Sequence, residues 1–382
     1  LASTALATLL VLTFWRMDHP RRKRKYIRDK VRYNDSVFES HVTLSTQLPR
    51  TIQGWRVPGA SYDTDEKIWQ DLADVLRDAG YVQWDHDGFS LLSSPGLTFP
   101  SLGGFGYALD TRKMGKIGSA SYLCGFEYSN PLTRAVRTRD GMDAVVRVMV
   151  IGNEGHEHLR ILRRIATGEQ SMYSNNHTLP MFAEFQLEDI IFAVFPKVGA
   201  TLRESYCSWP NNSVADVIDM IMQMLEGLAF IHNLKIAHRD AFRDNFVLEW
   251  QPESLTKFSP SRPRVYLIDF ETAVDFPPEY PADKCVLSGY PFPLETYKRA
   301  HAPEFASEKP YCPFKVDVWQ LGTSLLDFQS TIPAIDDALK DMRNTDPMIR
   351  PTAQEALNRL SDVVNSLAPK LLHIEPLDCE EI

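Results

Sequence analysis

The chain has 382 residues, of which 44% are hydrophobic and 24% are charged, and its formal net charge is −9. This composition is typical of a globular protein with a large apolar core, and it excludes low-complexity and fibrous classes. Residues 1–33 hold nine Lys/Arg against two Asp, a net charge of +7, which leaves −16 for residues 34–382. An acidic body argues against general nucleic-acid binding. It is compatible with a Mg-nucleotide site, which needs local carboxylates.

Residues 1–33 form an apolar and then basic leader. Leu1–Trp15 is apolar but shorter than the ~20 residues that span a bilayer, and five basic residues follow at 21–25. Two interpretations stay open. The segment is the end of a membrane helix, with the rest of the chain in the cytoplasm, or it is a disordered leader with Met17 as the true start. The basic run fits a membrane-surface patch, a nuclear address or a solvated tail.

Residues 34–115 are predicted to be an N-terminal extension without catalytic chemistry. Within it, apolar residues at 3–4 residue spacing predict one amphipathic helix, Asp63–Gly80. Residues 85–110 are rich in Gly, Pro and Ser and are expected to be a linker. We therefore expect residues 1–110 to be dispensable for the fold of the rest.

Residues 116–365 change character, because short β-branched runs come first and helical patterns dominate afterwards. Residues 366–382 are expected to be a tail. Strands followed by helices predict an α+β protein in two lobes. The expected elements are strands at Ala144–Ile151, Asp189–Phe195, Asn245–Trp250 and Val265–Ile268, helices at Glu157–Ala166 and Val214–His232, and further helices from 305 to 367.

Four short motifs and a later arginine follow one another in a fixed order. His238-Arg239-Asp240 comes directly after the long predicted helix, with Asn245 five positions after Asp240, and Asp269-Phe270-Glu271 ends a later apolar strand. Ala302-Pro303-Glu304, a DxWxxG sequence at 317–322 and Arg350 complete the set. This order resembles the eukaryotic protein kinases. The AVVR and DFE sequences and Asn176–Pro180 (NHTLP) also look like the divergent kinase-like proteins of mushroom-forming fungi.

The resemblance implies a two-lobed kinase fold, with a small β-rich N-lobe and a larger helical C-lobe, and a role for each motif residue. Asp240 would orient the attacking hydroxyl and accept its proton, and Asn245 and Asp269 would hold Mg²⁺ beside ATP. Glu304 and Arg350 would form a buried structural ion pair. Asp317 would accept backbone hydrogen bonds from the catalytic loop.

The chain departs from the family on the nucleotide side. Arg147 stands at the position of the strand lysine that binds the α- and β-phosphates. His158 stands at the position of its glutamate partner, so Glu154 or Glu157 is the expected alternative partner of Arg147. Only Gly118 remains of the phosphate-binding glycine loop.

Three further assignments rest on the resemblance. Val194 is expected as gatekeeper, with Phe195 and Lys197 in the adenine-binding hinge. Glu271 replaces the glycine of the metal motif and would restrict movement of Asp269. Phe242 replaces a catalytic-loop lysine; Arg243 beside it would face either the γ-phosphate, as a catalytic cation, or solvent.

The leading functional hypothesis is an ATP- and Mg²⁺-dependent protein kinase that phosphorylates Ser/Thr hydroxyls of a protein substrate. The alternative is a pseudokinase that binds nucleotide or a protein partner as a scaffold. A small-molecule phosphotransferase is disfavoured because the elements at 302–304 and 317–322 build a peptide-side lobe. Five dispersed cysteines without a CxxC pair indicate reduced thiols and an intracellular, cytoplasmic protein: Cys124, Cys207, Cys285, Cys312 and Cys379.

Overall fold

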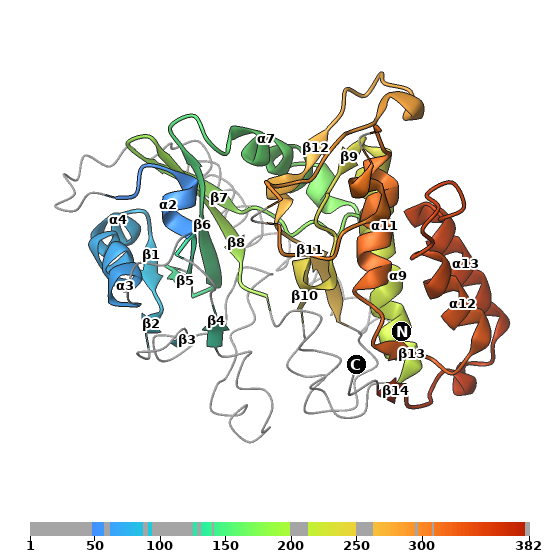
Figure 1. Ribbon diagram of the computed structural model, residues 1–382. Helices are drawn as coiled ribbons and strands as arrows, with labels where there is room; N and C mark the ends of the chain where they lie inside the picture. The colour runs from blue at the N-terminus through green and yellow to red at the C-terminus, as the bar shows by residue number, and fades with distance from the viewer. Residues whose placement is uncertain are drawn as a thin grey trace, which may run out of the picture.

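The computed structural model describes residues 48–56, 62–86, 91–93, 125–127, 131–139, 141–198, 213–249, 263–294, 297–307 and 309–378. The leader at 1–33 and Gly118 lie outside these ranges. The described residues form the predicted α+β fold in two lobes, a sheet lobe and a helical lobe, which lie side by side in Figure 1. Across the part of the chain that the structure describes, no helix is long and apolar enough to cross a membrane.

The sheet lobe is built on five antiparallel strands in the order β1-β5-β6-β8-β7. The predicted strands at 144–151 and 189–195 are confirmed as β6 and β8, and the three others were not predicted. The bounds are β1 Tyr81–Gln83, β5 Thr133–Thr138, β6 Asp143–Ile151, β7 Ala183–Leu187 and β8 Ile190–Pro196. A smaller sheet of β2 (Asp85–His86), β3 (Leu91–Ser93) and β4 (Gly125–Glu127) shows that the predicted linker is partly strand.

The N-terminal extension packs on this sheet. Its helices are α2 (Ile52–Arg56), α3 (Tyr62–Asp71) and α4 (Ala73–Asp78), so the helix predicted at 63–80 is divided in two at Leu72. Their buried side chains share one core with residues of β1, β5, β6, β7 and β8, among them Trp55, Trp69, Leu72, Val75, Leu76, Val146 and Phe192. This packing argues against the prediction that residues 1–110 are dispensable, because removal of this segment would expose the outer face of the sheet.

Helix α7 (His156–Ile165) lies between the sheet and the helical lobe and matches the helix predicted at 157–166 (Figure 1). It begins after Gly155, whose φ of 88° is a left-handed conformation. A Cβ atom at Gly155 would lie 1.9 Å from the carbonyl oxygen of Met149, so only glycine fits this turn. Leu159, Ile161 and Leu162 anchor the helix in the main core.

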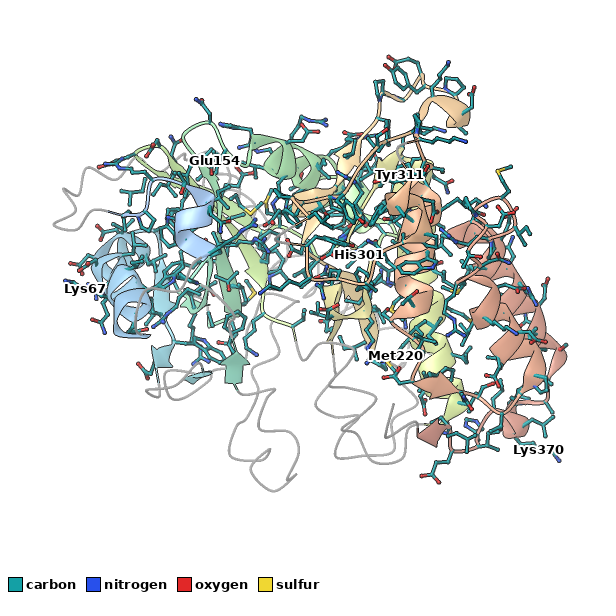
Figure 2. All side chains as sticks on the ribbon, viewed as in Figure 1. Lys67, Glu154, Met220, His301, Tyr311 and Lys370 are labelled. Carbon is teal, nitrogen blue, oxygen red and sulfur yellow. The ribbon has the colours of Figure 1, made fainter. Side chains whose placement is uncertain are left out.

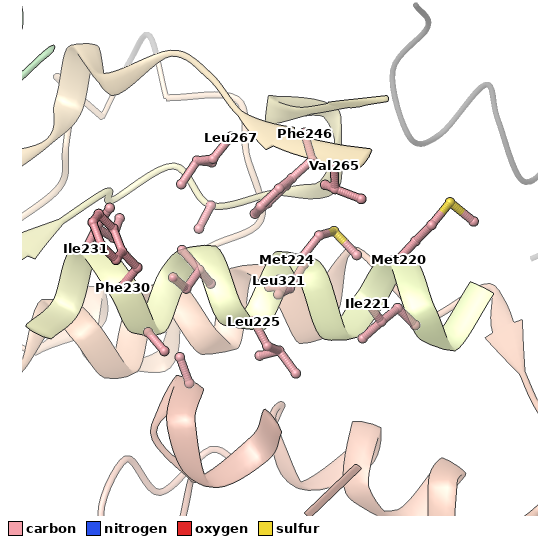
Figure 3. Packing of buried hydrophobic residues seen from close by; sticks show 14 of the residues in the cluster. Met220, Ile221, Met224, Leu225, Phe230, Ile231, Phe246, Val265, Leu267 and Leu321 are labelled. Atoms are coloured by element: carbon pink, nitrogen blue, oxygen red, sulfur yellow. The ribbon is translucent and has the colours of Figure 1, made fainter. Parts of the chain in front are cut away.

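The helical lobe surrounds α9 (Val214–Asn233). A capping box formed by Ser213 and Asp216 stabilises the start of this helix. Figure 3 shows Phe246, Val265 and Leu267 facing one side of α9, and Leu225 pointing to the other. The methionines of α9 are core residues, since Met220 and Met224 are buried and Met222 packs against the same core. The other elements are β9 Ile236–Ala237, β10 Phe246–Glu249, β11 Arg264–Leu267, β12 Val274–Asp275, α11 Pro313–Thr323, β13 Phe328–Gln329, α12 Pro333–Asp341, α13 Ala353–Ser366 and β14 Leu377–Asp378.

The segment after α13 is part of the fold. The backbone N–H groups of Val214 and Ala215, in the first turn of α9, donate to the carbonyl oxygens of Ile374 (2.8 Å) and Leu372 (2.9 Å). Strand β14 pairs with β13. The tail predicted to begin at 366 is therefore a structural element at least as far as Asp378, since it caps the helix at the centre of the lobe.

Candidate active site

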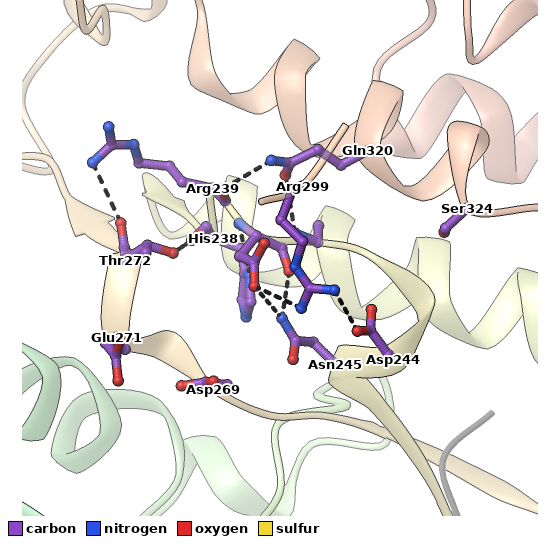
Figure 4. A network of polar contacts seen from close by, with 12 residues as sticks. His238, Arg239, Asp244, Asn245, Asp269, Glu271, Thr272, Arg299, Gln320 and Ser324 are labelled. Atoms are coloured by element: carbon purple, nitrogen blue, oxygen red, sulfur yellow. Dashed lines mark hydrogen bonds and ion pairs between the residues drawn. The ribbon is translucent and has the colours of Figure 1, made fainter. Parts of the chain in front are cut away.

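The catalytic loop runs between β9 and β10, and two side chains of α11 hold its backbone. Both carboxylate oxygens of the fully buried Asp317 accept backbone hydrogen bonds, from the N–H of His238 (2.8 Å) and of Arg239 (2.7 Å). Gln320, one turn along α11, accepts from the N–H of Ala241 and donates to the carbonyl of Arg239, each at 2.9 Å (Figure 4). The predicted role of Asp317 is confirmed.

Asp240 and Asn245 form the centre of the loop. The amide nitrogen of Asn245 donates to the backbone oxygen and to Oδ2 of Asp240, both at 2.7 Å. The other oxygen, Oδ1 of Asp240, is buried and has no hydrogen-bond partner among the described residues. Burial raises the pKa of Asp240 above its ordinary value, although Arg299, His238 and Asn245 oppose the shift. A buried carboxylate oxygen without a donor is suited to accept a proton or a hydrogen bond from a substrate.

Arg299 is a site residue that the motifs did not reveal. Its Nη2 lies 3.3 Å from Oδ2 of Asp240, its other terminal nitrogen pairs with Asp244, and its guanidinium lies 5.3 Å from the ring centre of Phe242. It reaches the loop from the segment just before Ala302-Pro303-Glu304. No local sequence pattern links it to Asp240, because the two residues are 59 positions apart.

Arg243, by contrast, is directed away from this cluster. Its Nη1 donates to both oxygens of Asp327 at 2.6 Å, and its backbone N–H donates to the hydroxyl of Ser324 at 3.1 Å. It is not among the residues that line the interlobe cleft. The structure thus favours neither alternative predicted for Arg243, because Asp327 holds its side chain, and Arg299 is the cation beside Asp240.

Asp269 and Glu271 share one cation from the sheet lobe. Nη2 of Arg147 lies 2.8 Å from Oδ1 of Asp269 and 3.2 Å from Oε2 of Glu271. Burial alone would raise the pKa of Asp269, but the charge of Arg147 and the nearby His158 and His238 outweigh it and lower that pKa. For Glu271, burial and the charge of Asp269 prevail over Arg147 and Arg56, and the pKa is raised.

The expected carboxylate partners of Arg147 are engaged elsewhere. Glu154 accepts from the backbone N–H of Ile52 at 2.8 Å, and Glu157 pairs with Arg160. His158 is buried beside Arg147, and burial together with that charge lowers its pKa to about 3, so it is neutral at physiological pH. The predicted Arg147–Glu154 or Arg147–Glu157 pair is wrong, because Arg147 extends across the cleft to the metal motif.

Arg56 of α2 completes the site from the N-terminal extension. It forms an ion pair with Glu271, and its guanidinium lies 5.6 Å from the ring centre of Phe292. It also lines the interlobe cleft, which has a volume of about 350 Å³. The other lining residues are Leu132, Thr133, Arg147, Asp240, Asp269, Glu271, Phe292, Tyr297, Lys298 and Arg299.

The structure places the predicted gatekeeper, Val194, on the face of β8 opposite to Arg147. Side chains alternate along β8, and Val194 belongs to the outer core with α3 and α4, whereas Phe195 lies in the inner core shared with the helical lobe. Val194 is therefore not the gatekeeper, since Phe195 occupies the face that carries Arg147. The N–H of Lys197 donates to Asp143 at 3.0 Å and its Nζ lies 5.1 Å from the ring centre of Trp84. Neither Phe195 nor Lys197 lines the cleft.

The oxygen ligands available in the site fit a divalent metal ion. Asn245 uses its amide nitrogen toward Asp240, which leaves its side-chain oxygen for other partners, and Asp269 lies in the same cleft region (Figure 4). In the part of the chain that the structure describes, no cluster of three or more His, Cys, Asp or Glu ligands occurs. Mg²⁺ needs only one or two carboxylates when phosphates and waters complete its shell.

Comparison with known proteins agrees with this geometry. The sequence model of the protein kinase domain matches residues 169–377, more than half of the chain. Serine/threonine-protein kinase ppk8 of Schizosaccharomyces pombe is 39% identical over 100 residues, 26% of this chain and 17% of that protein. Serine/threonine-protein kinase SKM1 of Saccharomyces cerevisiae is 30% identical over 156 residues, 41% of this chain and 18% of that protein. The matches thus span less than a fifth of these relatives. The chain belongs to the protein kinase family.

Proposed function

We propose that this protein is an active kinase that transfers the γ-phosphoryl group of ATP to a Ser or Thr hydroxyl of a protein substrate. The observation that carries the proposal is the carboxylate of Asp240. Asn245 and Arg299 hold one of its oxygens, and the other is buried and has no hydrogen-bond partner among the residues that the structure describes. Both relatives are named serine/threonine-protein kinases, which supports the same class of acceptor.

In the proposed reaction each residue has one task. Asp240 orients the acceptor hydroxyl and takes its proton while the new O–P bond forms and the bond to the ADP oxygen breaks. Asn245 and Asp269 would hold Mg²⁺, which when bound neutralises charge on the phosphates. Arg147 would place its positive charge on the α- and β-phosphates, a task that requires it to share or release Asp269.

The decisive experiment separates binding from transfer. The melting temperature of the full chain is measured with ATP, with and without Mg²⁺, and phosphorylation of generic Ser/Thr substrates is followed in parallel. We expect Asp269→Ala to abolish the Mg²⁺-dependent shift and Asp240→Asn to keep it while losing transfer. Asp337→Asn is the matched control, since Asp337 is exposed on α12. Transfer by Asp240→Asn at the wild-type rate would refute the catalytic assignment.

A pseudokinase is the second candidate, and the double ion pair of Arg147 favours it. A guanidinium neutralised by Asp269 and Glu271 is less available to phosphate than an ammonium held by a helix glutamate. If transfer is the function, Arg147→Ala should weaken ATP binding and transfer, and Arg147→Lys should preserve or increase both. A scaffold would bind its partner equally well in both variants and would show no transfer in either.

We propose an intracellular, cytoplasmic location for this protein. Cys285 and Cys312, the cysteines in the described residues, are free thiols, which agrees with the proposed intracellular, cytoplasmic location. Membrane contact through residues 1–33 is proposed from their apolar and basic sequence alone. Cell fractionation with and without these residues would test it, since loss of the leader should release a membrane-bound fraction.

A further inference from the structure

We infer that Arg56 of the N-terminal extension is a positioning residue of the active site. It holds the Asp269–Glu271 segment and leaves Arg147 available for nucleotide phosphates. The part of this inference that concerns nucleotide rests on the proposed function. The part that concerns the Arg56–Glu271 pair stands on the structure of the free protein.

Helix α2 is fixed firmly enough to position a side chain. The N–H of Ile52 donates to Oε2 of Glu154 at 2.8 Å, and Figure 2 shows Glu154 beside this helix. Trp55 is completely buried, packs edge-on against Trp69 with ring centres 5.8 Å apart, and donates its indole N–H to Pro49. The helix is thus anchored to the turn before α7 and to the core of the sheet lobe.

The side chain of Arg56 extends from this anchored helix to the segment that begins with the Asp269-Phe270-Glu271 motif. It pairs with Glu271 and lies over the ring of Phe292, so that one side chain contacts two separate positions of that segment. Its side chain is 25% exposed and that of Glu271 is 20% exposed. Solvent therefore screens this pair less than it screens a surface ion pair.

The charges explain why a second cation is needed. Asp269 and Glu271 both accept from Arg147, so two carboxylates depend on one guanidinium when Arg56 is absent. If Arg147 then moved to a phosphate, the Mg²⁺ that Asp269 would hold could compensate Asp269, but Glu271 would face an anionic ligand without a cation. With Arg56 present, Glu271 keeps a partner after Arg147 moves. The negative charge of Glu271, which replaces the family's glycine, is thus compensated by Arg56 of the N-terminal extension.

The first test uses the nucleotide-free chain. Urea midpoints are measured for Arg56→Gln, Glu271→Gln and the double variant. We expect Arg56→Gln to lower the midpoint in the wild-type background and to leave it unchanged when Glu271 is already Gln. Arg56→Lys should restore much of the loss. The control is Arg50→Gln in the same extension, because Arg50 is 70% exposed and lies 3.7–3.8 Å from Asp189 and Glu188. Equal effects of Arg56→Gln in both backgrounds would overturn the inference.

The second test measures the dissociation constant of Mg-ATP for the same variants. Arg56→Gln should raise it about tenfold, the ratio that corresponds to about 1.4 kcal/mol. Glu271→Gln should abolish this effect, and Arg50→Gln should have none. An unchanged dissociation constant in Arg56→Gln would show that Arg56 does not serve nucleotide binding. If the wild-type chain binds no ATP, the proposed function fails together with this second part, while the urea cycle still decides whether Arg56 holds Glu271.

Discussion

The guanidinium of Arg299 lies 3.3 Å from the carboxylate of Asp240, although the two residues come from different segments of the chain. The ring of Phe242 lies beneath this guanidinium, at the position where the family resemblance places a lysine. The positive charge that the catalytic loop has lost is thus supplied by the segment before Ala302-Pro303-Glu304. That segment therefore contributes to the electrostatic environment of the Asp240 carboxylate.

Replacing Arg299 by Gln should therefore change the pH profile of phosphate transfer. Burial raises the pKa of Asp240 and Arg299 opposes the rise, so loss of Arg299 raises this pKa further. The acidic limb of kcat/KM should move to higher pH, and the neutral-pH rate should fall on the order of a hundredfold. Arg243→Gln is the matched control, because Arg243 pairs with Asp327. An acidic limb that moves only in Arg243→Gln would restore the role first predicted for that residue.

Glu271→Gln should stabilise the protein at neutral pH. The pKa of Glu271 is raised above its ordinary value of 4.5, so the stability linked to its protonation is present below that value and is lost as pH rises through the folded pKa. The gain in melting temperature should thus be present near pH ~7 and vanish near pH ~4. Asp269→Asn should behave oppositely, because the pKa of Asp269 is lowered, so its contribution to stability is fully present above the ordinary value of 3.8 and is lost as pH falls through the folded pKa. A gain for Glu271→Gln that is independent of pH would contradict this account.

The predicted Glu304–Arg350 ion pair is confirmed and buried, with N–O distances of 2.7 and 3.1 Å. Arg350→Met should lower the free energy of unfolding by about 3–5 kcal/mol, since it leaves a buried carboxylate unpaired. Adding Glu304→Met should recover part of that loss. Arg359→Met removes a half-exposed pair with Asp341 and should cost less than about 1 kcal/mol. Urea unfolding of the four proteins tests this order.

The extension should contribute measurably to stability. Trp69 is 1% exposed and donates its indole N–H to Pro131 at 3.0 Å, so Trp69→Ala should cost about 3–5 kcal/mol. Val82→Ala on the adjacent strand β1 is the control, because Val82 is 53% exposed. Limited proteolysis should release no resistant core that starts near residue 116. Such a core would show that the sheet lobe is stable without the extension.

The sequence predicted those features that local patterns encode. Periodicity placed β6, β8, α7 and α9 to within one or two residues. The motif spacing identified Asp240, Asn245 and Asp269; in the structure Asp240 and Asp269 line the cleft, and Asn245 donates to Asp240. Strand β1 was not predicted, because in a strand of three residues the alternation of apolar and polar side chains is too short to be distinguished from a turn.

The ion-pair partners of the motif residues could not be predicted from the sequence, for a different reason. Arg56 and Arg299 are ordinary charged residues in segments with no motif, and only tertiary packing brings them to Glu271 and Asp240. The gatekeeper error has a simpler cause. A displacement of one residue along a strand moves a side chain to the opposite face, and no local pattern in a fully apolar strand fixes which face is which.

The backbone hydrogen bonds between Leu372, Ile374 and the first turn of α9 have a consequence for the mechanics of the molecule. A pulling force on the C-terminus, such as an unfolding protease applies, would first separate β14 from β13, which are only two residues each. It would then free the N–H groups of Val214 and Ala215 and open the central helix at its capped end. The force would then act on α13, which precedes this segment in the chain and packs in the same core as α9, so the helical lobe would lose structure from its C-terminal end inward.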